Sequence, residues 1–165
     1  MDFANEIKRL LAVAPMIFIL GCTGGPLAYQ KPLTTAPPET SVLLAKNSKA
    51  AVFKAAQQVL VSEGYQITNT NEAAGVISTA YRNLKVTPEQ ADCGSLWGHH
   101  YLDDTRTRTR VAFGVVVTED KLTVRADIQG EFPGKGIGYV VFTCVSRGPL
   151  ENSLLNKIMA AASLK

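Results

Sequence analysis

Residues 105–129 contain two runs of alternating side chains, separated by the acidic pair Glu119 and Asp120. One face of the first run, 105–118, carries Thr105, Thr107, Thr109, Val111, Phe113, Val115 and Val117. The apolar face of the second run carries Leu122, Val124, Ala126 and Ile128. A period of two residues is that of a β-strand with one buried face. The chain must therefore form a long antiparallel hairpin, and a second layer must cover its apolar face.

Residues 48–63 are predicted to form a helix that supplies part of this second layer. Alanine is abundant there, and helix propensity is high. Ser48 is the expected N-cap, and Gly64 stands where a glycine commonly ends a helix. One stripe at helical spacing is apolar and consists of Val52, Phe53, Ala56, Val59 and Leu60.

A second helix is predicted over residues 149–162. Pro149 suits the first helical position, and the carboxylate of Glu151 suits the positively polarised first turn. Its apolar stripe consists of Leu150, Leu154, Leu155, Ile158, Met159 and Ala162.

Shorter segments extend the predicted sheet. Residues 65–70 and 75–82 flank an Asn-rich turn and predict a second hairpin, and residues 139–145 are apolar and extended. The region between the hairpins, 83–104, is irregular. Its Thr-Pro-Glu-Gln run is a capping-box pattern with proline at the first helical position, which predicts a short helix at 88–92.

The order of helix, strands and helix predicts one α+β domain over residues 47–165. Two amphipathic helices need one sheet face to cover, and an antiparallel sheet offers one. We therefore expect a two-layer fold in which a curved antiparallel sheet grips two helices on one of its faces.

Residues 1–21 have the layout of a secretory signal peptide. Lys8 and Arg9 precede an apolar run at 10–20, and the small residue Gly21 follows it. The run is shorter than the roughly 20 apolar residues that a membrane-spanning helix needs. The sequence therefore predicts export, with removal of this segment.

The residues at the end of this segment, Ile19-Leu20-Gly21-Cys22, resemble the lipobox of bacterial lipoproteins. The resemblance implies cleavage before Cys22 and acylation of that cysteine, so that a lipid anchor holds the protein on a membrane. Thr23 follows instead of an acidic residue, which in that family implies the outer membrane, with the protein facing the periplasm. The alternative is an ordinary signal peptide that leaves Cys22 as a plain thiol.

Residues 22–46 are predicted to be a flexible tether between the anchor and the domain. The segment is rich in residues that resist regular structure, namely Gly24, Gly25, Pro26, Pro32, Pro37 and Pro38.

Two cysteines remain if Cys22 is acylated. In an exported chain, Cys93 and Cys144 predict a disulfide. The alternative is a pair of buried free thiols. Two cysteines do not supply the four ligands of a structural zinc site.

The arrangement of helix and hairpin also resembles the helix-grip domains of BamC-like lipoproteins, which belong to the outer-membrane β-barrel assembly machinery. The resemblance rests on residues 51–64 leading into Tyr65-Gln-Ile-Thr, on Gly75-Val-Ile-Ser-Thr, and on Leu150-Glu151 at the start of the last helix. It implies the fold and a scaffold-like function, and it brings no catalytic residues. This chain has one such domain and a short tether, in contrast to the two domains and long N-terminal segment of BamC.

A row of arginines is the main candidate for a binding surface. Arg106, Arg108 and Arg110 alternate on the polar face of the first long strand, and Arg125 is expected near them on the paired strand. Such a row can dock the phosphate or carboxylate groups of an anionic partner. The alternative is a solvated face whose cations pair with Asp103, Asp104 and Asp127.

The irregular region carries residues with possible chemistry. His99, His100, Asp103 and Asp104 are of metal-ligand type, but no HExxH or comparable spacing supports a metal site. Cys93 with a nearby histidine would suit a thiol nucleophile, a role that the predicted disulfide opposes. We therefore expect no catalytic residues, no metal and no cofactor.

These features together predict a non-enzymatic outer-membrane lipoprotein, an accessory or scaffold subunit that binds another envelope protein. A net charge of +3 is too mild to suggest a nucleic-acid partner. One alternative is a periplasmic module that binds a ligand or lipid between sheet and helix, with residues 130–138 at its mouth. A further alternative is an envelope hydrolase.

Overall fold

The computed structural model describes residues 31–32, 40–45, 48–96, 98–134 and 138–163. In chain order its elements are β1 (Thr40–Leu43), α1 (Lys49–Ser62), β2 (Ile67–Asn71), β3 (Val76–Thr79), β4 (Arg82–Asn83), β5 (Ala91–Asp92), β6 (Ser95–Leu96), β7 (His99–His100), the 3-10 helix η1 (Tyr101–Asp103), β8 (Arg108–Val117), β9 (Lys121–Pro133), β10 (Tyr139–Ser146) and α2 (Pro149–Ser163).

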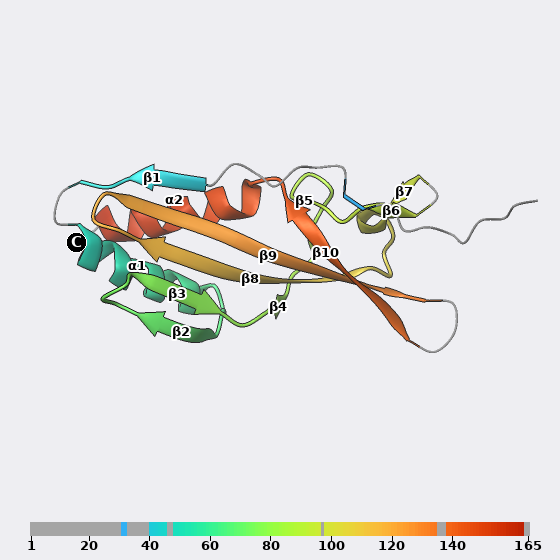
Figure 1. The fold of residues 1–165 in the computed structure, drawn as a ribbon, viewed down its shortest axis with the longest axis horizontal. Helices are drawn as coiled ribbons and strands as arrows, with labels where there is room; N and C mark the ends of the chain where they lie inside the picture. Colours follow the sequence, from blue (N-terminus) through green and yellow to red (C-terminus); the bar gives the residue numbers. More distant parts are fainter. Residues whose placement is uncertain (1–30, 33–39, 46–47, 97, 135–137, 164–165) are drawn as a thin grey trace, which may run out of the picture.

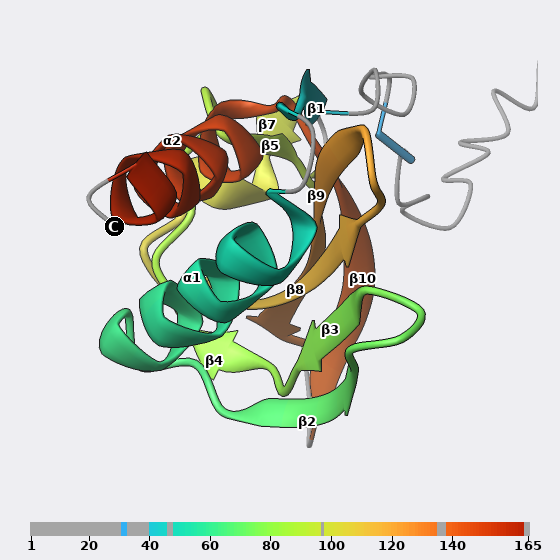
Figure 2. The same cartoon turned by 90° about the vertical axis from the view of Figure 1, so that its left-hand side faces the viewer.

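The predicted α+β fold with an antiparallel sheet is confirmed. The main sheet has the order β2-β3-β8-β9-β10-β5, with β1 added to β9 and β4 to β8. Both helices lie on the same face of this curved sheet, and the two views in Figures 1 and 2 agree on it. The opposite face of the sheet has no helix over it among the described elements, and we call it the outer face.

The long hairpin predicted from the alternating pattern forms the centre of the sheet. β8 and β9 pair in one continuous antiparallel register, from Arg108 opposite Glu131 to Val117 opposite Leu122. The alternate residues that face the helices are buried, and six of them are 0% exposed: Val111, Val115, Val117, Leu122, Val124 and Ile128. Their burial against the helices supplies the main apolar core of the domain.

The predicted helices are also confirmed, with one error at a terminus. Every residue of the apolar stripe predicted for α1 is buried, and Ala55 is buried with them. Gly64 has the positive φ angle of 78° expected of a glycine after a helix. Ser48, however, caps no backbone N–H of the helix; its hydroxyl donates to the carbonyl of Ala45 instead, at 2.6 Å.

The tether prediction is wrong for residues 40–43. They form β1, which pairs with β9 from Thr40 opposite Val124 to Leu43 opposite Lys121. Farther along the same edge, β10 pairs with β9 from Cys144 opposite Ile128 onward. In the gap between them, the buried carboxylate of Glu151 accepts hydrogen bonds from the Ala126 N–H at 3.3 Å and from the Ser146 hydroxyl at 2.7 Å. The Glu151 carboxylate therefore accepts a backbone hydrogen bond of β9 that a neighbouring strand would otherwise accept.

The short helix predicted at 88–92 is absent. The side chain of Gln90 does accept a hydrogen bond from the Thr87 N–H at 3.1 Å, so half of the capping box forms. The chain then turns into β5, where Ala91 and Asp92 pair with Ser146 and Val145 of β10. Pairing with a neighbouring strand thus prevails over the local helix signal. The predicted disulfide between Cys93 and Cys144 is present next to this pairing and joins β5 to β10.

Gly75, in the turn between β2 and β3, provides a test of the sheet geometry. Its φ angle is +71°, and a Cβ atom there would stand 1.9 Å from the carbonyl oxygen of Val117. Gly75→Ala should therefore lower the free energy of unfolding by about 2 kcal/mol or more. At Gly114, in the middle of β8, a Cβ atom would stand in open space, with no neighbouring side chain or strand within 4 Å. Gly114→Ala should raise stability by about 0.5 kcal/mol, and equal denaturation midpoints for the two variants would contradict this account.

Candidate functional site

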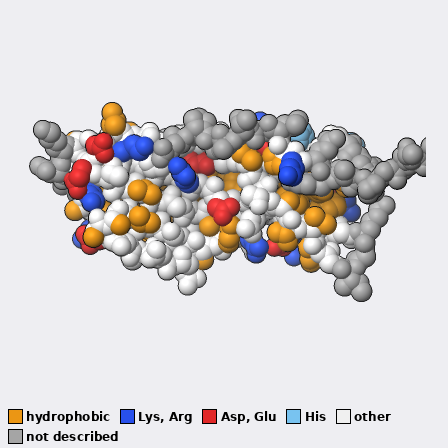
Figure 3. All heavy atoms as spheres, in the orientation of Figure 1, with side chains coloured by type: hydrophobic (Ala, Val, Ile, Leu, Met, Phe, Trp, Pro, Cys, Tyr) orange, Lys and Arg blue, Asp and Glu red, His pale blue; other side chains and the backbone are white. Residues whose placement is uncertain are grey.

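The polar residues of β8, β9 and β10 meet on the outer face. The register places Arg108 beside Glu131 and Arg110 beside Gln129, with Val141 and Thr143 of β10 next in the same rows. In the space-filling view of this side, cationic, anionic and hydrophobic side chains are interspersed (Figure 3). The outer face thus combines polar, charged and apolar side chains.

The two strand arginines of this face are held against aromatic rings. The Arg108 guanidinium carbon lies 5.8 Å from the centre of the Tyr139 ring, and that of Arg110 lies 5.2 Å from the centre of the Tyr81 ring. A cation over an aromatic face is attracted by the ring quadrupole. We call Arg108, Arg110, Tyr81 and Tyr139 the arginine–tyrosine cluster.

A hydrogen-bond network fixes one half of this cluster. Arg110 donates to the side-chain oxygen of Gln129 through Nε at 3.1 Å and Nη2 at 2.8 Å, and it lies 3.4 Å from the carboxylate of Glu131. Gln129 donates to the Tyr81 hydroxyl at 2.8 Å, and that hydroxyl donates to Asp127. Arg110 is therefore preorganised, and part of its charge is already balanced.

Arg108 differs from Arg110 in its surroundings. It is exposed, and among the described residues it forms no ion pair within 4.0 Å. Its contact with the ring of Tyr139 limits its conformations without neutralising its charge. Arg108 is therefore the cation of this face best placed to meet an anionic group of a partner.

The two other arginines of the predicted row lie elsewhere. Arg106 precedes β8 and is bound by the carboxylate of Asp104, with 2.7 Å between Nη2 and Oδ2. Its guanidinium lies 4.8 Å from the ring centre of Phe132, which packs against the core on the helix side. Arg125 pairs with Gly114, four residues along the strand from the position opposite Arg110, or roughly 13 Å away. The structure therefore keeps only Arg108 and Arg110 together.

The ion pair of Asp104 and Arg106 has a clear electrostatic effect. Hydrogen bonds from the side chain and backbone of Arg106 lower the pKa of Asp104 to about 2. The same pair raises the pKa of Arg106. This pairing matches the solvated alternative for that arginine, so Arg106 is not a free docking group.

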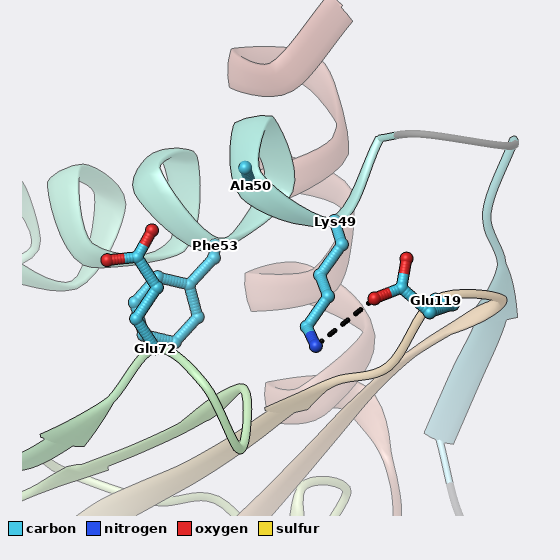
Figure 4. A pocket seen from close by; sticks show the side chains of 5 residues that line it. All are labelled: Lys49, Ala50, Phe53, Glu72 and Glu119. Atoms are coloured by element: carbon cyan, nitrogen blue, oxygen red, sulfur yellow. Dashed lines mark ion pairs between the residues drawn. The ribbon is translucent and has the colours of Figure 1, made fainter.

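Two hollows in the described surface are large enough for a small ligand. One, of about 610 Å³, lies on the outer face between Tyr81, Arg125 and Thr143. The other, of about 400 Å³, lies at one end of the molecule, between α1 and two hairpin turns (Figure 4). There Lys49 forms an ion pair with Glu119 at 3.2 Å, and Glu72 lines the same pocket from the β2–β3 turn. Phe53 lines this pocket and belongs to the core, so it separates the pocket from the interior.

The histidines of the irregular region lie at the surface. His99 and His100 form β7, which pairs with β6 in a small separate sheet. Within the part of the chain that the structure describes, no group of three or more His, Cys, Asp or Glu side chains is arranged to hold a metal ion. Cys93 is oxidised to a disulfide, so it is not a free thiol nucleophile.

The N-terminal predictions lie outside the described residues. These are the signal segment 1–21, the lipidated cysteine Cys22 and most of the tether. The described helices include none with the length and apolar character needed to cross a membrane.

Three participants in the outer-face network were not found from the sequence. Asp127 and Gln129 alternate with the apolar residues Ala126 and Ile128, which predicts that they face outward, but their partners depend on the register between strands, which alternation does not define. Tyr81 lies near the end of a predicted strand, and nothing in the sequence indicates that its hydroxyl reaches across β8 to β9.

Compared with known proteins, the chain matches no family model and no curated protein.

The network makes a prediction about Tyr81. Burial, followed by the hydrogen bond to and the charge of Asp127, raises the pKa of Tyr81 to about 12. Because its pKa is raised, the folded protein holds the Tyr81 proton more tightly than the unfolded chain does, and this difference stabilises the fold. The stabilisation is complete below pH 10 and is lost as the pH rises towards 12, because only the unfolded chain releases the proton in that interval. Asp127→Asn should lower the pKa of Tyr81, measured by NMR titration of its ring signals. An unchanged pKa of Tyr81 would contradict the network.

Proposed function

We propose that the protein is a non-enzymatic outer-membrane lipoprotein, anchored through Cys22 and facing the periplasm, where it acts as an accessory or scaffold subunit of an envelope complex. The proposed partner is an envelope protein that presents acidic side chains to the arginine–tyrosine cluster on the outer face. The observation that carries the proposal is the exposed Arg108, which forms no ion pair within 4.0 Å among the described residues, beside the preorganised Arg110.

The proposed location is supported by sequence and covalent structure. The apolar run at 10–20 followed by Ile19-Leu20-Gly21-Cys22 is the pattern of an exported and acylated chain. The disulfide between Cys93 and Cys144 agrees with this location, because such bonds persist in oxidising compartments. A short tether then gives the domain limited reach from the membrane surface.

The proposed partner chemistry is supported by the composition of the outer face. Tyrosine and arginine are enriched at the energetic centres of protein interfaces, where an aromatic ring adds apolar area to a directed charge. The cluster exposes apolar area of its own at Tyr139, which is 56% exposed, and Val141 on the same strand is 57% exposed. Binding would exclude water from the cluster and strengthen the charge pairing.

A ligand-binding module is the second candidate. The observation that favours it is the end pocket of about 400 Å³, within the usual range for small-ligand sites. Its lining by Lys49, Glu72 and Glu119 suits a small zwitterionic ligand better than a lipid. Native mass spectrometry of the purified protein should then detect a bound small molecule that is lost on Lys49→Ala.

The scaffold proposal is tested by isolating the full-length protein from the detergent-solubilised envelope of its source bacterium. The wild type should recover a partner in fixed stoichiometry, and Arg108→Gln with Arg110→Gln should reduce recovery at least tenfold. Cys22→Ala should leave the chain soluble or unprocessed, because the anchor cannot form.

A matched control for the arginine variant is Lys54→Gln with Lys157→Gln, which removes the same charge at two exposed positions on α1 and α2, on the other side of the sheet. This control should retain the partner. Equal loss in both variants would show a general charge effect, and recovery of no partner by the wild type would refute the scaffold role. Continued membrane anchoring of the Cys22→Ala protein would refute lipidation separately.

A further inference from the structure

Gly114 is a glycine in the middle of a regular strand that the described domain does not require. It lies on the outer face of β8, opposite Ser78 of β3 and Arg125 of β9. Its φ angle is not positive, and a Cβ atom there would meet no described atom within 4 Å. Because glycine inside a strand is less stable than alanine, the domain loses stability at this position without a gain in its own packing.

Gly114 lines the larger of the two hollows, of about 610 Å³, which we call the Gly114 hollow. Tyr81 and Asp127 line it on the side of the arginine–tyrosine cluster, and Thr143 and Val145 line it from β10. The hydroxyl of Tyr81 donates to Asp127, so this wall is held in place. A glycine inside a strand commonly marks a place where another molecule or chain approaches the backbone closely. The Gly114 hollow has the position and the size for such an approach.

The glycine of β9 shows which side chain this sheet places over a glycine. Phe142 of β10 lies directly opposite Gly130 of β9 in the register. A Cβ atom at Gly130 would stand 2.2 Å from a ring carbon of Phe142, so the aromatic ring lies over the glycine. An aromatic ring in this position supplies the apolar contact that a glycine lacks. On the outer face, no described ring lies within 4 Å of the corresponding point at Gly114.

We infer that the Gly114 hollow receives an aromatic side chain of the proposed partner, which lies over Gly114 as Phe142 lies over Gly130. The charged residues that line the hollow, Arg125 and Asp127, have opposite signs, so the hollow favours a neutral side chain. A ring there also lies beside Tyr81, and aromatic pairs stabilise each other beyond the area that they bury.

This assignment rests on the proposed function and specifies the chemistry of the partner further. Gly114 lies four residues from Arg110 and six from Arg108 along β8, which is roughly 13 and 20 Å. Both distances fit within one interface patch of standard size, about 800 Å² per protein. The partner therefore presents acidic side chains to the arginine–tyrosine cluster and an aromatic side chain to the Gly114 hollow.

Ser78→Phe tests the assignment, because it supplies the missing ring from the protein's own chain. Ser78 lies opposite Gly114 as Phe142 lies opposite Gly130. The new ring should raise the denaturation midpoint of the full chain. It should also reduce recovery of the partner from the detergent-solubilised envelope at least tenfold. Ser41→Phe is the matched control, at an exposed serine of β1 that pairs with β9, and it should retain the partner.

Gly114→Ala tests the same contact with the smallest possible change. Its methyl group has room in the isolated domain, so the variant folds, but it would collide with a ring placed as Phe142 is placed over Gly130. Recovery of the partner should again decrease at least tenfold. This loss of binding without loss of stability would not follow from a structural role of Gly114.

Nuclear Overhauser effects across the interface identify the occupant directly. The isotope-labelled full chain in detergent is combined with the unlabelled partner recovered above. The α-protons of Gly114 should then show intermolecular contacts to aromatic ring protons. Gly98, where a Cβ atom would also meet nothing within 4 Å, provides a control and should show none.

Failure of this assignment and failure of the scaffold role give different results. The assignment alone is overturned if Ser78→Phe or Gly114→Ala recovers the partner like the wild type while Arg108→Gln with Arg110→Gln does not. It is also overturned if the Gly114 α-protons contact only aliphatic protons of the partner, or none. Recovery of no partner by the wild type would overturn both proposals.

Discussion

Burial of one face of the β8–β9 hairpin is the interaction on which the rest of the structure depends. A shift of one residue in register would move every apolar side chain of a strand to the opposite face, so this burial defines the register as well as the core. Side chains such as Val115 and Ile128 are fully buried, and each contributes about 1.5–3 kcal/mol relative to exposure. Both helices cover this one face, and no described helix covers the outer face.

The other features of the domain complete the edges of this hairpin. β1 and β10 occupy two parts of the same edge of β9, and the carboxylate of Glu151 satisfies the backbone N–H in the gap between them. The disulfide then fixes the end of β10 to β5. The opposite end of β10, from Tyr139, extends away from the helices as a two-stranded arm with β9 (Figure 1). This division explains why the exposed apolar residues collect on that arm.

The elements that could be predicted from the sequence are those whose periodicity is long. Fourteen residues of α1 and ten of β8 each repeat one apolar face several times, so local pattern and tertiary burial agree. The prediction of a short helix at 88–92 was wrong because Ala91 and Asp92 pair with β10, a partner that the local sequence cannot reveal. β1 could not be predicted either, because a strand of four residues that follows prolines is too short to show a period.

For the candidate site, too, the residues within long periodic elements could be predicted and the others could not. Alternation placed Arg108 and Arg110 on the outer face correctly, because both lie within a regular strand. The same pattern wrongly grouped Arg106 with them, although Arg106 lies in the turn before β8. It also placed Arg125 too close, because the distance of Arg125 from the other arginines depends on the register between the strands. Glu151 was assigned to the helix terminus, although its main role is in the sheet edge. In each case the missing information was a contact between segments far apart in the sequence.

Occupancy of the outer face in the membrane is the central claim, and it can be measured by thiol accessibility. Ala112→Cys lies on the outer face next to Arg110, and Ala161→Cys lies on α2; both alanines are partly exposed. Maleimide labelling rates of the full chain should be compared in intact membranes and after detergent purification. The account predicts labelling at residue 112 at least tenfold slower in membranes, with no change at residue 161. Equal rates at residue 112 in the two states would contradict it.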